Sequence, residues 1–342
     1  MIVLIVISAI INQSIGQSIT SIIKWILLLE FMVIFLNCYL VDGPKQVTNL
    51  LLLAFSYPVI LQLLSILTGY SKVTEFDGSA SYIGGFFHEA VFSIIIFTSL
   101  FIGLMWLRYL KVKFKTNGMY LFSFFIFLLA MVNYRTTLIA ALPLIAMFIY
   151  DQYWKGGGTK KLSFSLIFAI AFMSLFFIEI DVLLDRFIEI PQVLGNASDL
   201  MTSPENYTNE EKRYLSGRLY IWSDYIALTN EGDWLHILIG NGMDSWKNYF
   251  LKYAHNTFVS FYYELGISGL AILSFIFFQM FKQVILLKER KVKYILSGMV
   301  MSFLILNLGT MPLWQIEGIF LFSYIFSFIC YFSILERLKN DS

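Results

Sequence analysis

The sequence has little charge and few of the residues that build common cofactor or metal sites. Only 14% of its 342 residues are Asp, Glu, Lys or Arg, whereas about a quarter is usual in soluble domains. The formal net charge of +1 gives no overall field that would attract nucleic acid. The two cysteines, Cys38 and Cys330, lie far apart in apolar runs, so the chain has no disulfide framework and no thiolate metal spacing.

Several motifs of nucleotide and metal chemistry are absent. The chain has no Walker lysine motif, no glycine fingerprint for dinucleotides and no Asp-x-Asp pair for a metal-bound sugar nucleotide. No cluster of His, Cys and carboxylates has metal-ligand spacing. We therefore expect no metal and no cofactor.

Long hydrophobic runs dominate instead. Hydrophobic residues make up 58% of the chain, and its mean hydropathy is +0.73. Since roughly 20 apolar residues cross a bilayer, the sequence predicts an all-α polytopic membrane protein with about ten transmembrane helices and one large extracytoplasmic loop. The first run is short. It either extends through the polar residues Asn12, Gln13 and Ser14 or forms a partial first helix. The expected spans are 2–17, 22–40, 47–67, 89–107, 118–134, 136–150, 162–178, 256–281, 294–310 and 317–335.

Basic residues in the short loops predict the orientation, because cytoplasmic loops are rich in Lys and Arg. Three basic loops, at 108–115, 155–161 and 282–293, fall on one side when the spans alternate. That side is then cytoplasmic, together with both termini. The acid-rich stretch 179–254 falls on the outside. We therefore divide the chain into N-terminal spans (1–178), an external loop (179–254) and C-terminal spans with a short tail (255–342).

The junction between this loop and the next span contains His255. An imidazole changes charge near neutral pH, so it could act as a general base on a hydroxyl group. The alternative is an ordinary interfacial residue that anchors the end of a helix.

Two arginines fall on the same predicted side. Arg218 lies among aromatic residues of the external loop, where its fork could bind phosphate oxygens or form a structural ion pair. Arg135 lies between two apolar runs, and a cation beside hydrocarbon is a functional hypothesis by default. His88 and Glu89, at the outer end of the fourth span, are possible substrate contacts. The glycines Gly266 and Gly269 favour close packing.

Ordered motifs resemble the O-antigen polymerase/ligase family. His255-Asn256, followed by Leu265-Gly266-Ile267-Ser268-Gly269-Leu270, is similar to that family's C-terminal signature. Upstream, Gly217-Arg218 with Trp222, the Gly240-Asn241-Gly242 turn and Tyr134-Arg135-Thr136 resemble further elements, the last with Tyr in place of the usual Ser. Gly84-Gly85 with His88-Glu89 is a looser match that lacks the usual following Pro. The resemblance covers roughly 80–270.

The resemblance implies a metal-independent membrane glycosyltransferase at the outer face of the bacterial cytoplasmic (inner) membrane. It would polymerise undecaprenyl-pyrophosphate-linked oligosaccharide repeat units into O-antigen or a related surface polysaccharide. His255 would be the general base or orient the acceptor, and Arg218 and Arg135 would hold the pyrophosphate. Asn256 would contact a sugar or fix the His255 loop. The implied partners are the lipid-linked oligosaccharide, membrane lipid, and a flippase and chain-length regulator of the same pathway.

Three other readings stay open. A ligase of the same family would transfer the glycan to lipid A-core. A transporter of polysaccharide or lipid-linked glycan could use Arg135, Glu30 and Glu264 along a path, although that class favours internal repeats that the sequence lacks. A membrane-bound acyltransferase would need His255 buried within a span or facing the acyl donor.

Overall fold

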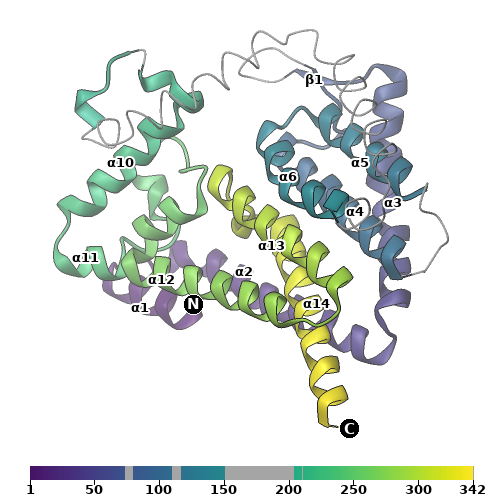
Figure 1. The fold of residues 1–342 in the computed structure, drawn as a ribbon. Coiled ribbons are helices and arrows are strands. Elements are labelled where there is room, and N and C mark those ends of the chain that lie inside the picture. Colours follow the sequence, from purple (N-terminus) through teal and green to yellow (C-terminus); the bar gives the residue numbers. More distant parts are fainter. Residues whose placement is uncertain (74–79, 110–116, 151–203, 210, 342) are drawn as a thin grey trace. The chain divides into compact units, whose positions relative to one another are not determined.

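The computed structural model describes residues 1–73, 80–109, 117–150, 204–209 and 211–341. The expected span 162–178, two of the basic loops in large part, and 179–203 of the external loop lie outside these residues. The longest helices are α2 (Ile15–Val41), α3 (Pro44–Thr68), α4 (Glu89–Tyr109), α12 (Thr257–Leu286), α13 (Arg290–Gly309) and α14 (Ile316–Asp341) (Figure 1). The shorter ones are α1 (Ile2–Ile11), α5 (Asn117–Val132), α6 (Arg135–Ile149), α10 (Arg218–Glu231) and α11 (Trp234–Ile239).

Short elements complete the described chain. The 3-10 turns are η2 (Pro204–Asn206), η3 (Glu211–Gly217), η4 (Ser245–Asn248) and η5 (Pro312–Trp314). Strands β1 (Lys72–Val73) and β2 (Ala80–Ser81) form one antiparallel pair, in which Lys72 lies opposite Ser81.

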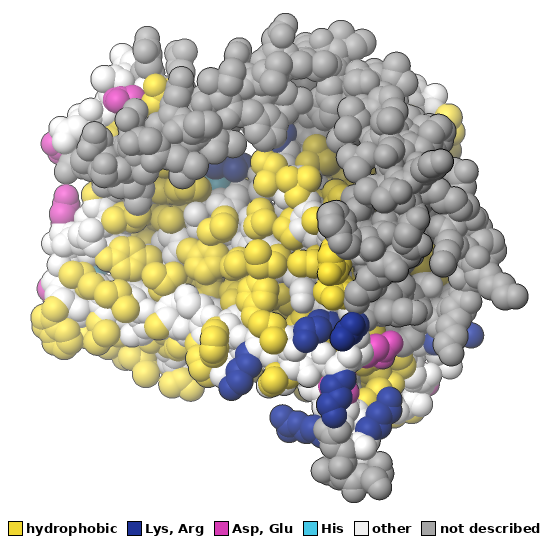
Figure 2. Space-filling model, in the orientation of Figure 1, with side chains coloured by type: hydrophobic (Ala, Val, Ile, Leu, Met, Phe, Trp, Pro, Cys, Tyr) yellow, Lys and Arg dark blue, Asp and Glu magenta, His cyan; other side chains and the backbone are white. Residues whose placement is uncertain are grey.

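The chain is a membrane-embedded helical protein. Among the described residues, six helices are long and apolar enough to cross a bilayer. Large apolar side chains point away from the protein along α2 and α3, including Val33, Leu53 and Leu67, and Figure 2 shows many such side chains on the visible surface. A water-facing helix would bury such a face, whereas a helix in lipid needs only its backbone polar groups satisfied internally. The number of ten spans stays a prediction.

The first expected span is not one helix. Helix α1 ends at Ile11 and α2 begins at Ile15, so the partial-helix alternative is correct. Gln13 turns the chain with a φ of 52°, and the Asn12 side chain donates to the carbonyls of Ser8 and Gly240 at 2.9 and 3.0 Å. These polar groups find partners in a turn that a continuous helix in lipid would not supply. Ten residues rise only about 15 Å, so α1 is too short to cross.

The chain forms two compact units that do not follow its linear order. Unit 1 contains Met1–Leu27, Phe177–Ile276 and Asn307–Met311; unit 2 contains Leu28–Phe176, Phe277–Leu306 and Pro312–Ser342. Three of the boundaries fall inside α2, α12 and α13. Unit 1 therefore combines the N-terminus with the described part of the expected external loop.

A break in α12 organises unit 1. Gly266 has a φ of 65° and a ψ of −164° inside this helix, which interrupts the regular hydrogen-bond ladder. The carbonyls of Tyr263 and Glu264 instead accept from the backbone N–H groups of Asn241 and Gly242, at 2.9 and 3.0 Å. A helix end normally leaves such carbonyls without a partner. The break thus joins α12 to the turn that follows α11.

Two glycines permit this crossing of backbones. A Cβ atom on Gly240 would lie 2.2 Å from the carbonyl carbon of Glu264, and one on Gly266 would lie 2.5 Å from that of Leu238. Neither position can hold a side chain without moving the other segment. The close-packing interpretation of Gly266 is confirmed, although its neighbour is a loop and a short helix end.

Unit 2 is a helical bundle with an aromatic centre. Phe35, Tyr39, Phe101, Tyr324 and Phe328 are buried there and contact one another at centroid distances of 4.5–6.3 Å. These aromatic side chains come from α2, α4 and α14 and bind the three helices together.

Hydrogen bonds at the two ends of unit 2 agree with the predicted alternation of spans. The backbone N–H groups of Lys288 and Glu289, in the turn between α12 and α13, donate to Glu336 near the end of α14 at 2.7 and 3.2 Å. Exposed basic residues surround this end (Figure 2). At the other end, the Tyr82 N–H donates to the Met131 carbonyl at 2.9 Å, so segment 80–88 lies beside the turn between α5 and α6.

Candidate functional site

Arg218 is the first residue of α10. Gly217 precedes it with a φ of 80°, a backbone conformation that glycine adopts at little cost. The Arg218 side chain is half-buried. A cation at a helix N-terminus opposes the helix dipole, so helix stability does not explain its position. The first-turn N–H groups and a guanidinium together suit an anion.

Helix α10 is fastened to the segment just before His255. The indole of Trp222 donates to the Ala254 carbonyl at 2.7 Å, and the Tyr225 hydroxyl donates to the Lys252 carbonyl at 3.0 Å. Tyr225 also stacks on Phe250, with ring centroids 3.8 Å apart. Burial raises the pKa of Tyr225, so it is a neutral donor here. These contacts fix α10, and therefore Arg218, to the segment of the chain that precedes His255.

His255 occupies a strained turn directly before α12. Its φ is 52°, which is uncommon for a residue other than glycine and marks a constraint. Its half-buried ring lies on Tyr253, with ring centroids 3.9 Å apart.

Asn256 caps the beginning of α12, directly after His255. Its buried side-chain oxygen accepts from the N–H groups of Phe258 and Val259 at 2.9 and 3.2 Å, which caps α12. That Asn256 also fixes the His255 turn or contacts a sugar stays a prediction, as does the role of His255 as a base or as an anchor of the helix end.

Arg135 has the corresponding position in unit 2. It is the first residue of α6, is half-buried, and follows Asn133, whose φ is 56°. In the same first turn, the Thr137 hydroxyl lies 2.7 Å from that of Ser93 in α4. This contact brings the beginnings of α4 and α6 together, so the structure places Arg135 at the same end of unit 2 as His88 and Glu89.

His88 and Glu89 both have partners within the fold. Glu89 pairs with Lys72 at 3.1 Å and lies in the first turn of α4, where an acid suits the helix dipole. Nδ1 of His88 accepts from the Ala90 N–H at 3.1 Å, while 45% of its side chain is exposed. These contacts give Glu89 a structural role, and substrate contact by either residue stays a prediction.

Two buried carboxylates support the site in unit 1. Glu264 is fully buried, and its Oε1 accepts from the Asp244 N–H at 3.2 Å. The Asp244 carboxylate pairs with Lys247 and accepts from the Ser21 hydroxyl, both at 3.2 Å. Glu264 therefore holds the loop backbone in place. Within the described residues, no group of three or more His, Cys, Asp or Glu could hold a metal ion.

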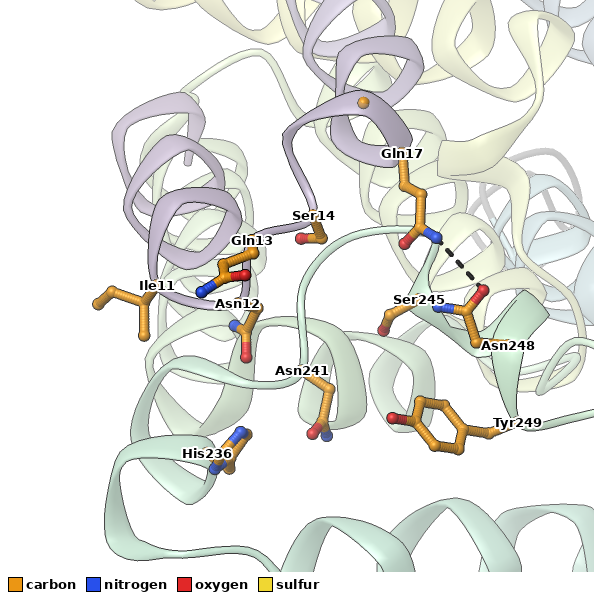
Figure 3. A pocket seen from close by; sticks show the side chains of 11 residues that line it. Ile11, Asn12, Gln13, Ser14, Gln17, His236, Asn241, Ser245, Asn248 and Tyr249 are labelled. Carbon is orange, nitrogen blue, oxygen red and sulfur yellow. Dashed lines mark hydrogen bonds between the residues drawn. The ribbon is translucent and has the colours of Figure 1, made fainter.

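Sequence reasoning missed a polar pocket of about 650 Å³ in unit 1. It lies between the turn that joins α1 to α2 and the chain from α11 to η4 (Figure 3). Two features of the sequence could have indicated this pocket. Polar residues occur between positions 12 and 17 inside an apolar segment, and Asn241 lies between two glycines. Its lining consists of Ile11, Asn12, Gln13, Ser14, Gly16, Gln17, His236, Asn241, Ser245, Asn248 and Tyr249.

His236 forms one wall of this pocket. Its Nδ1 lies 2.6 Å from Oδ1 of Asp233, and the same oxygen accepts the N–H groups of Leu235 and His236 at 3.1 and 3.0 Å. These bonds lower the pKa of Asp233, the contacts with His236 having the largest effect. The carboxylate thus caps α11 and orients the imidazole.

No protein-family model matches this chain, and neither a curated protein nor a solved structure shows significant similarity to it.

Proposed function

We propose that this protein polymerises undecaprenyl-pyrophosphate-linked oligosaccharide repeat units at the outer face of a bacterial cytoplasmic membrane. The observation that carries the proposal is the pair of half-buried arginines, Arg218 and Arg135, each at the first residue of a helix. Each combines a guanidinium with first-turn N–H groups, an arrangement suited to phosphate oxygens. A membrane protein with two such positions suits a lipid-linked substrate that carries a pyrophosphate.

The residues divide the reaction between them. His255 takes the proton from an acceptor hydroxyl, whose oxygen then attacks the anomeric carbon of the donor sugar. The bond from that carbon to the pyrophosphate oxygen breaks, and undecaprenyl pyrophosphate leaves. Arg218 stabilises the negative charge that develops on the leaving group, and the expected contact of Arg135 with the pyrophosphate stays a prediction. The strained turn of His255 and the Asn256 cap hold the base in a fixed position.

The proposed orientation has nine crossings instead of ten. Helix α1 is too short to span, and its turn into α2 bonds to the loop around Gly240 and Asn248, which we assign to the outside. The N-terminus then also lies outside, which revises the expectation of a cytoplasmic N-terminus. The three basic loops and the C-terminus keep their cytoplasmic assignment. The expected span at 162–178 still crosses from the inside to the outside in this orientation.

The test uses the full-length protein, purified into lipid nanodiscs and supplied with undecaprenyl-pyrophosphate repeat units extracted from the source organism. The wild type should produce a ladder of lengthened glycans on a gel. Arg218→Ala should lower the rate roughly 10- to 150-fold, as expected for a lost charge-assisted hydrogen bond. His255→Ala should lower it roughly 10²- to 10⁴-fold, as expected for a lost general base.

Arg290→Ala is the matched control. Arg290 is also the first residue of a helix, α13, but its side chain is exposed in the basic turn, so its removal should leave the ladder unchanged. Transfer to lipid A-core without a ladder would make the protein a ligase. Neither product from a well-folded wild-type protein would refute the glycosyltransferase proposal, and full activity of both site variants would refute the site.

A further inference from the structure

We propose that the polar pocket in unit 1 binds an uncharged sugar residue of the glycan. The choice of a glycan as ligand rests on the proposed function, but the recognition chemistry is that of the pocket itself. Its volume of about 650 Å³ falls within the range of roughly 300–1,000 Å³ typical of small-molecule sites.

The lining suits hydroxyl groups and does not suit phosphate. Five of its side chains are carboxamides and three carry hydroxyls, and none of the described lining residues is Lys, Arg, Asp or Glu. A phosphate site would need cationic donors. A sugar both donates and accepts hydrogen bonds, as amides and hydroxyls do. The pyrophosphate is therefore expected at the arginines, and a neutral part of the substrate in this pocket.

The polar groups of the pocket are held ready for a ligand. The Asn12 and Asn241 side chains each donate to a backbone carbonyl, of Gly240 and Tyr263, at 3.0 and 3.1 Å. Each amide is thereby oriented and keeps its own carbonyl oxygen as an acceptor. The walls are joined to the crossing of Gly240 with α12, so the pocket is built on a fixed support.

Ser14 gives an independent sign that a partner is missing. Its side chain is only 9% exposed, and its hydroxyl makes no hydrogen bond to any described residue, although it lines the pocket (Figure 3). A buried polar group without a partner is costly, and a rotation of the Ser14 side chain toward the pocket would let a ligand hydroxyl remove that cost. The exposed ring of Tyr249 borders the same space and offers an apolar face with a polar tip to a sugar ring.

The experiment measures binding of a free oligosaccharide to the full-length protein in nanodiscs by saturation-transfer NMR and titration calorimetry. The probe is the repeat-unit glycan released from its lipid by mild acid, with neither lipid nor phosphate attached. The double variant Gln17→Ala with Asn248→Ala removes two exposed side chains that, among the described residues, bond only to each other, at 3.2 Å. It should fold normally and weaken binding about fivefold for each hydrogen bond to the sugar that is lost.

Gln46→Ala, an exposed glutamine of α3 outside the pocket, is the matched control and should bind as the wild type does. Inorganic pyrophosphate should not displace the sugar. Ser14→Ala should weaken binding without lowering thermal stability, because its hydroxyl has no partner in the described chain to lose.

The inference is overturned if the wild type does not bind the free glycan, if the double variant binds it equally well, or if pyrophosphate competes with it. Glycan lengthening by a protein that fails this binding test would leave the proposed function standing without the pocket. Sugar binding that depends on the pocket, without any glycan lengthening, would support the pocket and leave the proposed function without support.

Discussion

The crossing of Gly240 with α12 can be tested by adding a single methyl group. Gly240 has a φ of 75° and a ψ of −173°, and a Cβ atom there would lie 2.2 Å from the backbone of Glu264 and Leu265. Gly240→Ala therefore adds backbone strain of about 1–3 kcal/mol and pushes the two segments apart. The separation breaks the bonds from Asn241 and Gly242 to α12, at a further cost of about 1 kcal/mol each.

The chain supplies a control that separates these two effects. Gly43 has a similar backbone, with a φ of 81° and a ψ of 151°, but nothing lies within 4 Å of its added Cβ atom. Gly43→Ala should therefore show the strain alone. Gly16→Ala, in a helix with open space around it, should be neutral or slightly stabilising.

The assay is thermal unfolding of the three variants in one detergent, followed by tryptophan fluorescence. We expect Gly240→Ala to unfold at the lowest temperature, with a free-energy loss about 2 kcal/mol larger than that of Gly43→Ala, from the two lost hydrogen bonds. Equal destabilisation of Gly240→Ala and Gly43→Ala would show that the two backbones do not cross as described, and would refute the account of unit 1.

Two further predictions concern charge and topology. Burial, with a smaller contribution from Glu231, raises the pKa of Asp224, so the ionised carboxylate destabilises the fold. Asp224→Asn should therefore raise the melting temperature at pH 7. This gain should shrink as the pH falls, because the wild-type carboxyl then becomes protonated. A gain that grows on acidification would contradict this sign. The topology can be tested in a variant whose Cys38 and Cys330 are replaced by Ala. Single cysteines introduced at Val3 and at Asp199 should react with a membrane-impermeant maleimide in intact spheroplasts, and one at Lys339 should not. Protection of the cysteine at position 3 would favour the ten-span topology over the nine crossings proposed above.

The sequence predicted the class of structure well because hydropathy acts on each segment separately. A run of apolar residues long enough to cross a bilayer must satisfy its own backbone, and a helix does so. For this reason eight of the ten expected runs, from 22–40 to 136–150 and from 256–281 to 317–335, coincide with described helices. The first run does not form one span because its polar residues Asn12 and Gln17 have partners more than 200 positions away, at Gly240 and Asn248, which local hydropathy does not show.

For the candidate site, too, the sequence and the structure contributed different parts. Residue type and local order were enough to single out Arg218, His255 and Arg135 as candidates, because a guanidinium can bind phosphate and an imidazole can transfer a proton wherever they lie. The structure added that both arginines begin helices and that Asn256 caps α12. The meaning of Gly240 and Gly266 likewise depended on which backbone each one meets.

By itself, the sequence determined that this is a helical membrane protein, because bilayer thickness acts on each segment of the chain separately; the common side of its basic loops stays a prediction. Only the tertiary structure decided that the N-terminal turn and the loop after α11 enclose a polar pocket. That pocket exists because a break at Gly266 frees two carbonyls of α12 for a loop 22 residues earlier, and such a pairing is a property of the folded chain.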